Sequence, residues 1–426
     1  MITHPALAMA TLAPSVAMEA EAQSFIGRQQ PTLPSGLLTP EALWAMGRVG
    51  SVNVNTAGTQ AVYNVSYYSV KENKSHAVLY TLDLKTKASK QLTTSTKSET
   101  GGVWIKDAQG RDRIAFLTSE SGSNQLWTMA PDGSDRQQAS FEKTDVVDFL
   151  FSPNSRRVIL VKEVEQRTAI QANDDDLPLS SGMVINDLMY KHWDQYVTTA
   201  PHPFVADFDG LRASNAKDIL EGEPYESPMM PFGGHEQLAW SPNSDQVAYT
   251  CRKKTGVEYA ISTDSDIYLY DLATGTTRNL CKPEGWQAPT DTDPTRSLQH
   301  QSVNQQKVDA NMGYDQNPQF SPDGQYIAWN SMARDGYESD RQRICIYNLK
   351  TGEKRYVTEK FDSSVDDFVW ASDSRTLYFA GVWHAKTNLY STNLKGEVKQ
   401  LTKEQADYAL VGIMPNQKHL IAKRRS

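Results

Sequence analysis

The sequence predicts an all-β protein built as a β-propeller of four-stranded antiparallel blades, and two recurring patterns support this. The first is a turn of the form Phe/Trp-Ser-Pro-Asp/Asn-Gly/Ser between apolar runs, clearest from Phe151, Trp240 and Phe320 and degenerate from Trp370. The second is a short alternating strand, a polar turn and another short strand, as in ICIYNLKTGEKRYVT from Ile344. Four short strands repeated over about 40–50 residues are typical of propeller blades.

The residues of the first turn have clear physical roles. Proline presets φ for a turn, Asp or Asn caps the turn through its own side chain, and Gly adopts a positive φ. Weaker copies lie at Thr56–Gly58 and Asp107–Gly110, and Met414-Pro415-Asn416 opens another. One blade cannot bury both of its faces, so neighbouring blades must stack around a central axis. We therefore expect the tryptophans at the ends of first strands to form inter-blade core: Trp104, Trp240 and Trp370.

The repeats divide the chain into six complete blades and part of another. The propeller is predicted over residues 43–426, with blades at residues 43–94, 99–141, 142–222, 233–281, 314–358 and 361–402. A seventh blade begins at about Ala406 and supplies two strands, so the intact protein is expected to have seven blades and this chain to be a piece of it. The alternative is six closed blades followed by a tail.

The N-terminal region differs from the repeats. Residues 1–22 contain no Lys or Arg and are rich in Ala, Met, Leu and Val, and Ala20-Glu21-Ala22 fits a small-x-small cleavage site. This stretch is interpreted as the remnant of an export signal, with an irregular N-terminus as the alternative. Residues 23–42 contain Pro31 and Pro34 and are expected to be a linker.

Composition excludes several classes of function. The 426 residues include 43 basic and 51 acidic ones, giving a net charge of −8 without a long basic block, so nucleic acid is not an expected partner. No apolar stretch approaches the roughly 20 residues of a membrane-spanning helix. The three cysteines lack CxxC spacing, and HExxH, GxSxG and GxGxxG are all missing, so we expect no catalytic residue, metal ligand or cofactor site.

Long connections are expected on one face of the propeller. Blade three has an insertion from about Glu165 to Ala200, inter-blade loops span residues 221–234 and 282–313, and blades one, four and five are predicted to have long gaps between their second and third strands. Loops of an antiparallel blade alternate between faces, so second-to-third-strand and fourth-to-first-strand loops share one side. We call this side the expanded face, and it is the predicted binding face because binding residues concentrate on loops held by a rigid scaffold.

Several stretches resemble a known family. INDLMYKHWDQYV from Ile185, HPFVADFDG from His202, DILEGEPYESPM from Asp218 and RDGYESDRQR from Arg334 are similar to the N-terminal propeller of the prolyl oligopeptidase family of serine peptidases, of the dipeptidyl-peptidase V type. The resemblance implies a partner C-terminal α/β-hydrolase domain that carries the Ser, Asp and His and is missing from this chain. It also implies dipeptide removal from short peptides, a periplasmic or secreted location and a possible homodimer. The alternative is a stand-alone TolB-like propeller acting as a protein-interaction scaffold.

The expanded face contains the candidate substrate-binding residues. A peptidase that counts from a free N-terminus must neutralise an ammonium, and carboxylates do this through charge-assisted hydrogen bonds. Glu221, Glu223 and Glu226 in EGEPYE are the candidates, and the alternative is a solvated loop whose prolines pack against the next blade.

Other candidates lie on neighbouring insertions. The group His192, Trp193 and Asp194 is predicted at the substrate entrance or at the hydrolase contact, or alternatively as the packing anchor of the insertion. Tyr259 and Tyr337 are predicted to line a peptide channel, or alternatively to pack across strands. Asp264 and Asp266 in TDSDIYLYD hint at calcium ligands, although a polar turn that enters a strand is the preferred interpretation.

Overall fold

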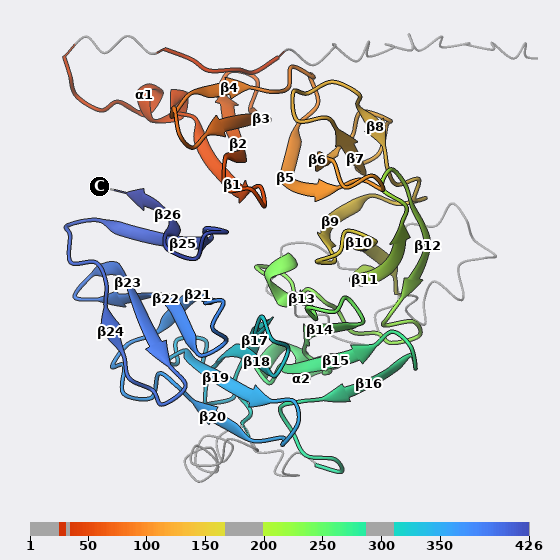
Figure 1. The fold of residues 1–426 in the computed structure, drawn as a ribbon, viewed down its shortest axis with the longest axis vertical. Coiled ribbons are helices and arrows are strands. Elements are labelled where there is room, and N and C mark those ends of the chain that lie inside the picture. Colours follow the sequence, from red (N-terminus) through yellow and green to blue (C-terminus); the bar gives the residue numbers. More distant parts are fainter. Residues whose placement is uncertain (1–24, 31–34, 167–198, 287–310, 426) are drawn as a thin grey trace, which may run out of the picture.

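The computed structural model describes residues 25–30, 35–166, 199–286 and 311–425. Within these ranges, six four-stranded antiparallel sheets and one two-stranded sheet follow one another around a ring (Figure 1). In each four-stranded sheet the strands lie in sequence order, with the first strand at the centre of the ring. The predicted propeller of six blades and a partial seventh is confirmed.

Each blade contains four consecutive strands. Blades one to three comprise β1 (Arg48–Val54), β2 (Gln60–Ser69), β3 (Lys74–Asp83), β4 (Ser89–Gln91), β5 (Glu99–Lys106), β6 (Asp112–Thr118), β7 (Gln125–Met129), β8 (Gln137–Gln138), β9 (Val146–Phe151), β10 (Arg157–Glu165), β11 (Thr199–Phe208) and β12 (Ala213–Asp218). Blades four to six comprise β13 (Leu238–Trp240), β14 (Gln246–Cys251), β15 (Asp266–Asp271), β16 (Thr276–Asn279), β17 (Asp315–Phe320), β18 (Tyr326–Ser331), β19 (Arg343–Asn348), β20 (Lys354–Tyr356), β21 (Val365–Trp370), β22 (Thr376–Trp383), β23 (Lys386–Asn393) and β24 (Lys399–Gln400). The two-stranded sheet comprises β25 (Asp407–Ile413) and β26 (Leu420–Arg425), and the helices are α1 (Pro40–Ala45), α2 (Gly256–Ile261) and the 3₁₀ turn η2 (His235–Gln237).

The turns between first and second strands share one conformation, as the repeat predicted. In each, a residue with positive φ donates its amide to the carbonyl three residues earlier, for example Gly324 to Ser321 at 2.9 Å. The positive-φ residues of the seven described turns are Gly58, Gly110, Ser155, Ser244, Gly324, Ser374 and Gln417. Ser374 also accepts a hydrogen bond of 3.0 Å from the amide of Asp323 in the preceding blade, so these turns help to hold neighbouring blades together.

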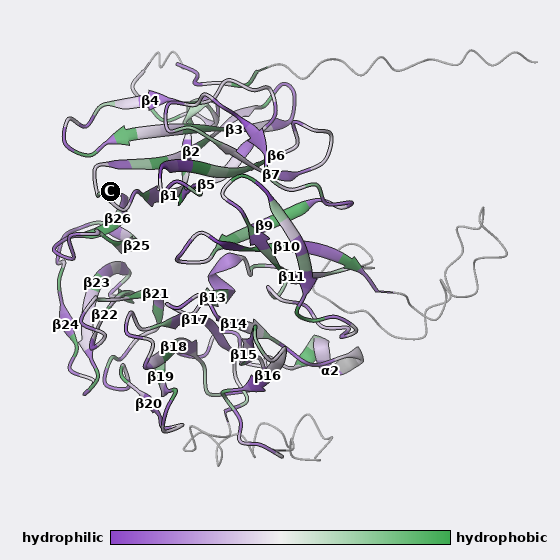
Figure 2. Cartoon of the chain, turned by 45° about the vertical axis from the view of Figure 1, so that its right-hand side comes forward, coloured by the Kyte–Doolittle hydropathy of each residue, from purple (hydrophilic) through white to green (hydrophobic). Residues whose placement is uncertain are grey.

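The hydrophobic core lies between adjacent blades. One cluster joins blades two and three through residues such as Leu117 and Leu160, and another joins blades five and six. Trp240 and Trp370 are buried in such clusters, and Trp104 packs against a third, which confirms their predicted role in the core. Figure 2 shows hydrophobic and hydrophilic segments alternating along strands such as β9, β10 and β11.

The prediction of a long gap in blade one is wrong. Strands β2 and β3 pair without interruption from Gln60↔Asp83 to Ser69↔Lys74, and only residues 70–73 join them. Asn73 adopts φ of 50° in this turn. The long connections predicted in blades four and five are present, at residues 252–265 and 332–342. The insertion predicted in blade three lies almost wholly outside the described residues.

The two-stranded sheet contacts both of its neighbours in the ring. The Gln417 side chain accepts a hydrogen bond of 3.1 Å from the amide of Ser372 in blade six. On the other side, Lys423 Nζ donates to the carbonyl of Gly50 in blade one at 3.4 Å. Before the first blade, Ile26 is buried and its carbonyl pairs with a ring nitrogen of His76 at 2.9 Å. No helix in the described ranges is long and apolar enough to cross a membrane.

Candidate functional site

The expanded face above blades three to five contains most of the predicted site residues. Glu221, Glu223 and Glu226 lie between β12 and β13, Tyr259 lies on α2 between β14 and β15, and Tyr337 lies between β18 and β19. Figure 2 shows α2 projecting from the sheets of blade four. The long gap predicted in blade four thus contains a short helix. The group His192, Trp193 and Asp194 lies outside the described residues.

Glu226 and Tyr259 are brought together, although 33 residues separate them. Glu226 is 2% exposed, and its Oε1 accepts hydrogen bonds from the Tyr259 hydroxyl and, at 3.1 Å, from the amide of Met230. The Arg252 guanidinium lies 4.1 Å from the centre of the Tyr259 ring. The Glu226 carboxylate is therefore part of a buried network that attaches the EGEPYE loop to α2.

Glu223 has a different environment. Its Oε2 accepts a hydrogen bond of 2.5 Å from Lys253 Nζ, and both side chains keep part of their surface in solvent. Lys253 Nζ also lies 4.7 Å from the centre of the Tyr268 ring and 5.6 Å from that of Tyr225. Glu221 is exposed. The three glutamates thus have different environments, because one is exposed, one is ion-paired and one is buried.

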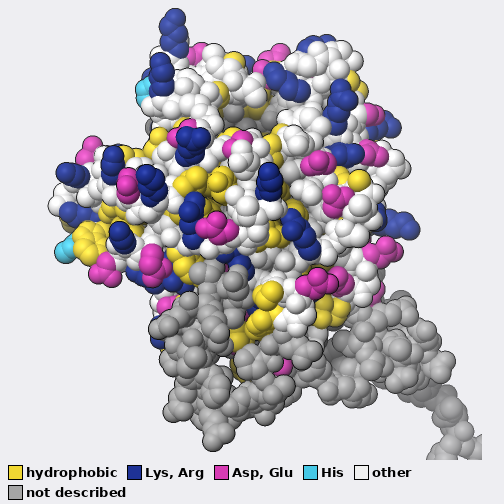
Figure 3. Space-filling view, turned by 60° about the horizontal axis from the view of Figure 1, so that its bottom comes forward, with side chains coloured by type: hydrophobic (Ala, Val, Ile, Leu, Met, Phe, Trp, Pro, Cys, Tyr) yellow, Lys and Arg dark blue, Asp and Glu magenta, His cyan; other side chains and the backbone are white. Residues whose placement is uncertain are grey.

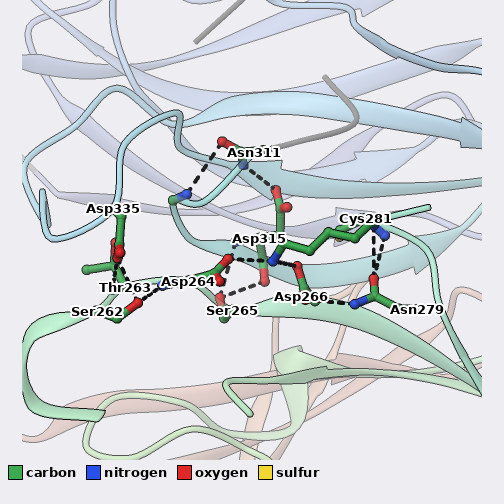
Figure 4. Close-up of polar contacts among 12 residues, drawn as sticks. Ser262, Thr263, Asp264, Ser265, Asp266, Asn279, Cys281, Asn311, Asp315 and Asp335 are labelled. Atoms are coloured by element: carbon green, nitrogen blue, oxygen red, sulfur yellow. Dashed lines mark hydrogen bonds and ion pairs between the residues drawn. The ribbon is translucent and has the colours of Figure 1, made fainter. Parts of the chain in front are cut away.

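The long loops of blades four and five are joined by hydrogen bonds, several of which Figure 4 shows. Asp335 Oδ1 accepts from the Ser262 hydroxyl at 2.8 Å and from the Thr263 amide at 2.7 Å. Burial raises the pKa of Asp335, and the hydrogen bond from Ser262 opposes that shift. The Arg334 guanidinium lies 4.2 Å from the Tyr337 ring centre. Tyr259 and Tyr337 therefore belong to two loops that form one continuous structure.

Asp264 and Asp266 hold a lysine. Lys282 Nζ donates to Asp264 Oδ1 at 2.5 Å and to Asp266 Oδ1 at 2.7 Å, and all three residues are buried. Lys254 Nζ lies 3.1 Å from the other oxygen of Asp264. The residues thus form an ion-pair network within blade four and the connection that follows it, at the polar segment that enters β15. Sequence reasoning missed Lys282, which follows the polar β16 strand without a recognisable motif.

One described group of side chains has donor atoms close enough to share a cation. The donor atoms of Asp266, Cys281 and Asp315 all lie within 4.8 Å of one another. Lys282 already neutralises Asp266, and burial raises the pKa of the Cys281 thiol well above its usual value. Lys282 therefore supplies the positive charge that such a group would otherwise need, and the group is better described as an internal ion pair.

A pocket of about 930 Å³ lies beside this network. Its wall includes Lys253, Tyr268, Arg278, Trp286, Tyr347 and Lys354, so it combines aromatic faces with basic groups.

Basic and acidic side chains are interspersed over the surface seen in Figure 3, without a large area of one charge.

A second cavity of about 460 Å³ lies among the first strands of blades one to three. At its wall, the His235 amide donates to Asp148 Oδ2 at 2.8 Å and a ring nitrogen of His235 lies 3.1 Å from the same oxygen. The hydrogen bond to Asp148 raises the pKa of His235, and burial opposes the shift. The pair joins blades three and four.

Comparison with known proteins adds a relationship that the geometry alone does not provide. No protein-family model matches the chain. The chain is 40% identical over 411 residues to a dipeptidyl-peptidase 5 of Porphyromonas gingivalis, which covers 95% of this chain and 55% of the relative. The predicted resemblance to the prolyl oligopeptidase family is confirmed. A dipeptidyl-peptidase 5 of Porphyromonas endodontalis is 37% identical over 398 residues, covering 93% of this chain and 53% of the relative.

The match to these prolyl oligopeptidase-family relatives concerns their propeller portion. The chain spans about half the length of the curated relatives it matches. The structure of an acylaminoacyl peptidase from Pyrococcus horikoshii superimposes with a TM-score of 0.55 at 15% identity, covering 86% of this chain and 47% of that one. That likeness shows the fold alone.

Proposed function

We propose that this chain is the propeller of a serine-type dipeptidyl peptidase, which admits short peptides and positions them for an attached hydrolase domain. The observation that carries the proposal is the 40% identity to a dipeptidyl-peptidase 5 over 95% of this chain. In this proposal the hydrolase domain supplies the Ser, Asp and His, and the propeller contributes binding and orientation. The chain alone is then inactive.

Glu223 is proposed to bind the amino terminus of the peptide. Its carboxylate lies on the expanded face, its side chain is 34% exposed, and it already binds an ammonium, that of Lys253. A charge-assisted hydrogen bond of this kind is about twice as strong as a neutral one. Glu226 and Tyr259 are proposed to hold the loop that presents Glu223, because Glu226 is buried and their hydrogen bond joins the loop to α2.

The expanded face is also proposed to contact the hydrolase domain. It carries exposed apolar side chains on three different connections: Phe232 before β13, Ile261 at the end of α2 and Trp383 at the turn between β22 and β23. The proposal rests on their shared position on the expanded face, since a face that another domain covers carries apolar groups. The predicted roles of His192, Trp193 and Asp194 at the entrance, and of Tyr337 in a channel, are part of the same proposal.

Export is proposed from the N-terminal pattern Ala20-Glu21-Ala22, which fits a cleavage site. Cell fractionation followed by N-terminal sequencing tests it. A mature N-terminus at Gln23 in the exported fraction supports the proposal, and an uncleaved cytoplasmic product contradicts it.

The peptidase proposal is tested on the protein that joins this propeller to the hydrolase domain. Release of dipeptides is measured from chromogenic peptides with a free or an acetylated amino terminus. Glu223→Gln is expected to raise KM for the free peptides roughly 10-fold or more with little change in kcat, since a hydrogen bond to a charged group contributes about 1.5–3 kcal/mol. Glu221→Gln, at the exposed position, is the control and should change little.

Two results would contradict parts of this proposal. An unchanged KM in both variants would refute an amine-binding role for these glutamates. Failure to release any dipeptide would refute the peptidase assignment and would favour the scaffold alternative.

A further inference from the structure

The ammonium of Lys253 lies in an enclosure that resembles a ligand site. Three groups surround it: Glu223 Oε2 at 2.5 Å, the Tyr268 ring centre at 4.7 Å and the Tyr225 ring centre at 5.6 Å. A carboxylate together with aromatic faces is the arrangement by which proteins recognise ammonium groups, since the ring faces attract a cation within about 6 Å. The Tyr268 ring stays neutral, because burial raises the pKa of its hydroxyl.

Lys253 differs from the two basic residues beside it. Arg252 donates to the carbonyl of Ser262 at 2.9 Å, and Lys254 pairs with Asp264, so both have partners within the loop of blade four. Lys253 alone among the three reaches across to Glu223 on the connection from blade three. Its side chain and the Tyr268 ring also form part of the wall of the 930 Å³ pocket, so the Lys253 and Tyr268 side of the enclosure borders free space. Glu223 keeps 34% of its side-chain surface in solvent.

We infer that Glu223, Tyr225 and Tyr268 form a binding site for a primary ammonium, and that Lys253 occupies it in the free chain. An incoming peptide amine must then displace Lys253 before it can bind. Lys253 acts as an internal competitor, which weakens the apparent affinity for every ligand of the site. This inference rests on the proposed amine-binding role of Glu223, and it adds the aromatic walls and the competing lysine.

The direct test uses this chain without any peptidase assay. Lys253→Ala empties the enclosure, and methylammonium chloride is added as the probe of the vacated position. A ligand that binds the folded state raises Tm, by linkage. We expect the Tm of Lys253→Ala to rise with methylammonium over roughly 10–100 mM, a range that follows from a weak single-ammonium contact, while the wild-type Tm is unaffected. Sodium chloride at equal ionic strength is the control for salt.

The double variant Glu223→Gln/Lys253→Ala separates this site from general effects, because it removes the carboxylate and should abolish the methylammonium response. If Lys253→Ala does not fold, Lys253→Met keeps the stem without the charge. Binding of dipeptides to Lys253→Met is followed by NMR. Dipeptides with a free amino terminus should bind this variant more tightly than they bind the wild type. Acetylated dipeptides should bind both proteins equally. Equal responses of wild type and the Lys253 variants to these probes would overturn the inference.

The two proposals fail in distinguishable ways. A methylammonium response in Lys253→Ala, combined with an unchanged KM in Glu223→Gln of the intact peptidase, would keep the ammonium site and refute its use for substrate. Absence of the response, with a raised KM in Glu223→Gln, would refute Lys253 as a competitor and keep the role of Glu223.

Discussion

The indole Nε1 of Trp240 donates a hydrogen bond of 3.0 Å to the backbone carbonyl of Leu150, on the first strand of the preceding blade. Trp370 makes the equivalent bond of 3.2 Å to Gln319 between blades five and six. Trp104 occupies the same position in blade two, but its buried Nε1 has no acceptor among the described residues. The same residue at the same repeat position is thus bonded in two blades and unbonded in a third.

Trp240→Phe is expected to destabilise the fold more than Trp104→Phe. The first variant removes a hydrogen bond, at a cost of about 0.5–1.5 kcal/mol beyond the lost packing, whereas the second removes a donor that has no acceptor. The Leu150 carbonyl keeps its place in the ladder with Ile159 in either case. Urea unfolding followed by circular dichroism measures both. Equal losses of unfolding free energy in the two variants would contradict the role of the Trp240 hydrogen bond.

Gly210 is expected to be intolerant of a side chain. It adopts φ of 103°, and a Cβ there would lie 2.4 Å from the backbone nitrogen of Ala108 in the neighbouring blade. Gly110 also has a positive φ, of 75°, but a Cβ there would meet open space. Gly110→Ala should therefore cost about 1–2 kcal/mol from backbone strain alone, while Gly210→Ala should cost more and shift the contact between blades two and three. Similar melting temperatures for both variants would argue against the close approach.

Lys282→Met is expected to be strongly destabilising at neutral pH. It leaves the buried carboxylates of Asp264 and Asp266 without their ammonium, and breaking a buried pair typically costs about 3–5 kcal/mol. Burial raises the pKa of Asp266 and the Lys282 ammonium opposes that shift, so without Lys282 this pKa rises further in the folded state. The loss should therefore shrink as pH falls and Asp266 becomes protonated. The exposed pair Arg424–Glu404 provides the control, because Arg424→Met breaks an ion pair in solvent and should change stability little. Denaturant unfolding at pH 5 and pH 7.5 measures both, and a pH-independent loss in Lys282→Met would contradict this account.

Asp315 should make folding stability fall as pH rises above about 4. Burial raises its pKa from 3.8 to about 6, and a hydrogen bond from Ser331 opposes the shift. Because the folded pKa lies above the unfolded one, the stabilising contribution is fully present below the unfolded pKa and is lost as pH rises through the folded pKa. Asp315→Asn keeps a side-chain oxygen for the 2.9 Å hydrogen bond from Trp329 Nε1 and should flatten this dependence.

Unfolding free energies of wild type and Asp315→Asn between pH 4 and pH 7 provide the measurement. The groups that face Asp315 are Asp266, Lys282 and Cys281, and they are unchanged in the variant. The difference between the two proteins should change by about 2–3 kcal/mol over this range, at 1.36 kcal/mol for each pKa unit. Parallel pH profiles would contradict the raised pKa.

The blades could be predicted because their signals are local. The turn Phe320–Gly324 specifies its conformation through residues that are adjacent in sequence, and the structure has that conformation. The wrong prediction of a long gap in blade one also has a local cause. Residues 66–76 are mostly polar, so no apolar alternation marked the ends of β2 and β3, although their backbones pair from end to end.

The site was predicted less completely, because its contacts connect distant parts of the sequence. EGEPYE stands out as an acidic motif, but its partner Lys253 lies 30 residues from Glu223. Lys282 similarly lies 18 residues from Asp264, and nothing in the spacing marks the two as a pair. Blade stacking creates such contacts, and a single sequence does not encode them as a pattern.

The single carboxylate of Asp335, shared with Ser262 and Thr263, has a consequence for how such a surface can change. The long connections of blades four and five are bound to each other here, so a change in the length or direction of one would disturb the hydrogen bonds of the other. A change in the ligand that the expanded face binds would then require substitutions in the connections of both blade four and blade five.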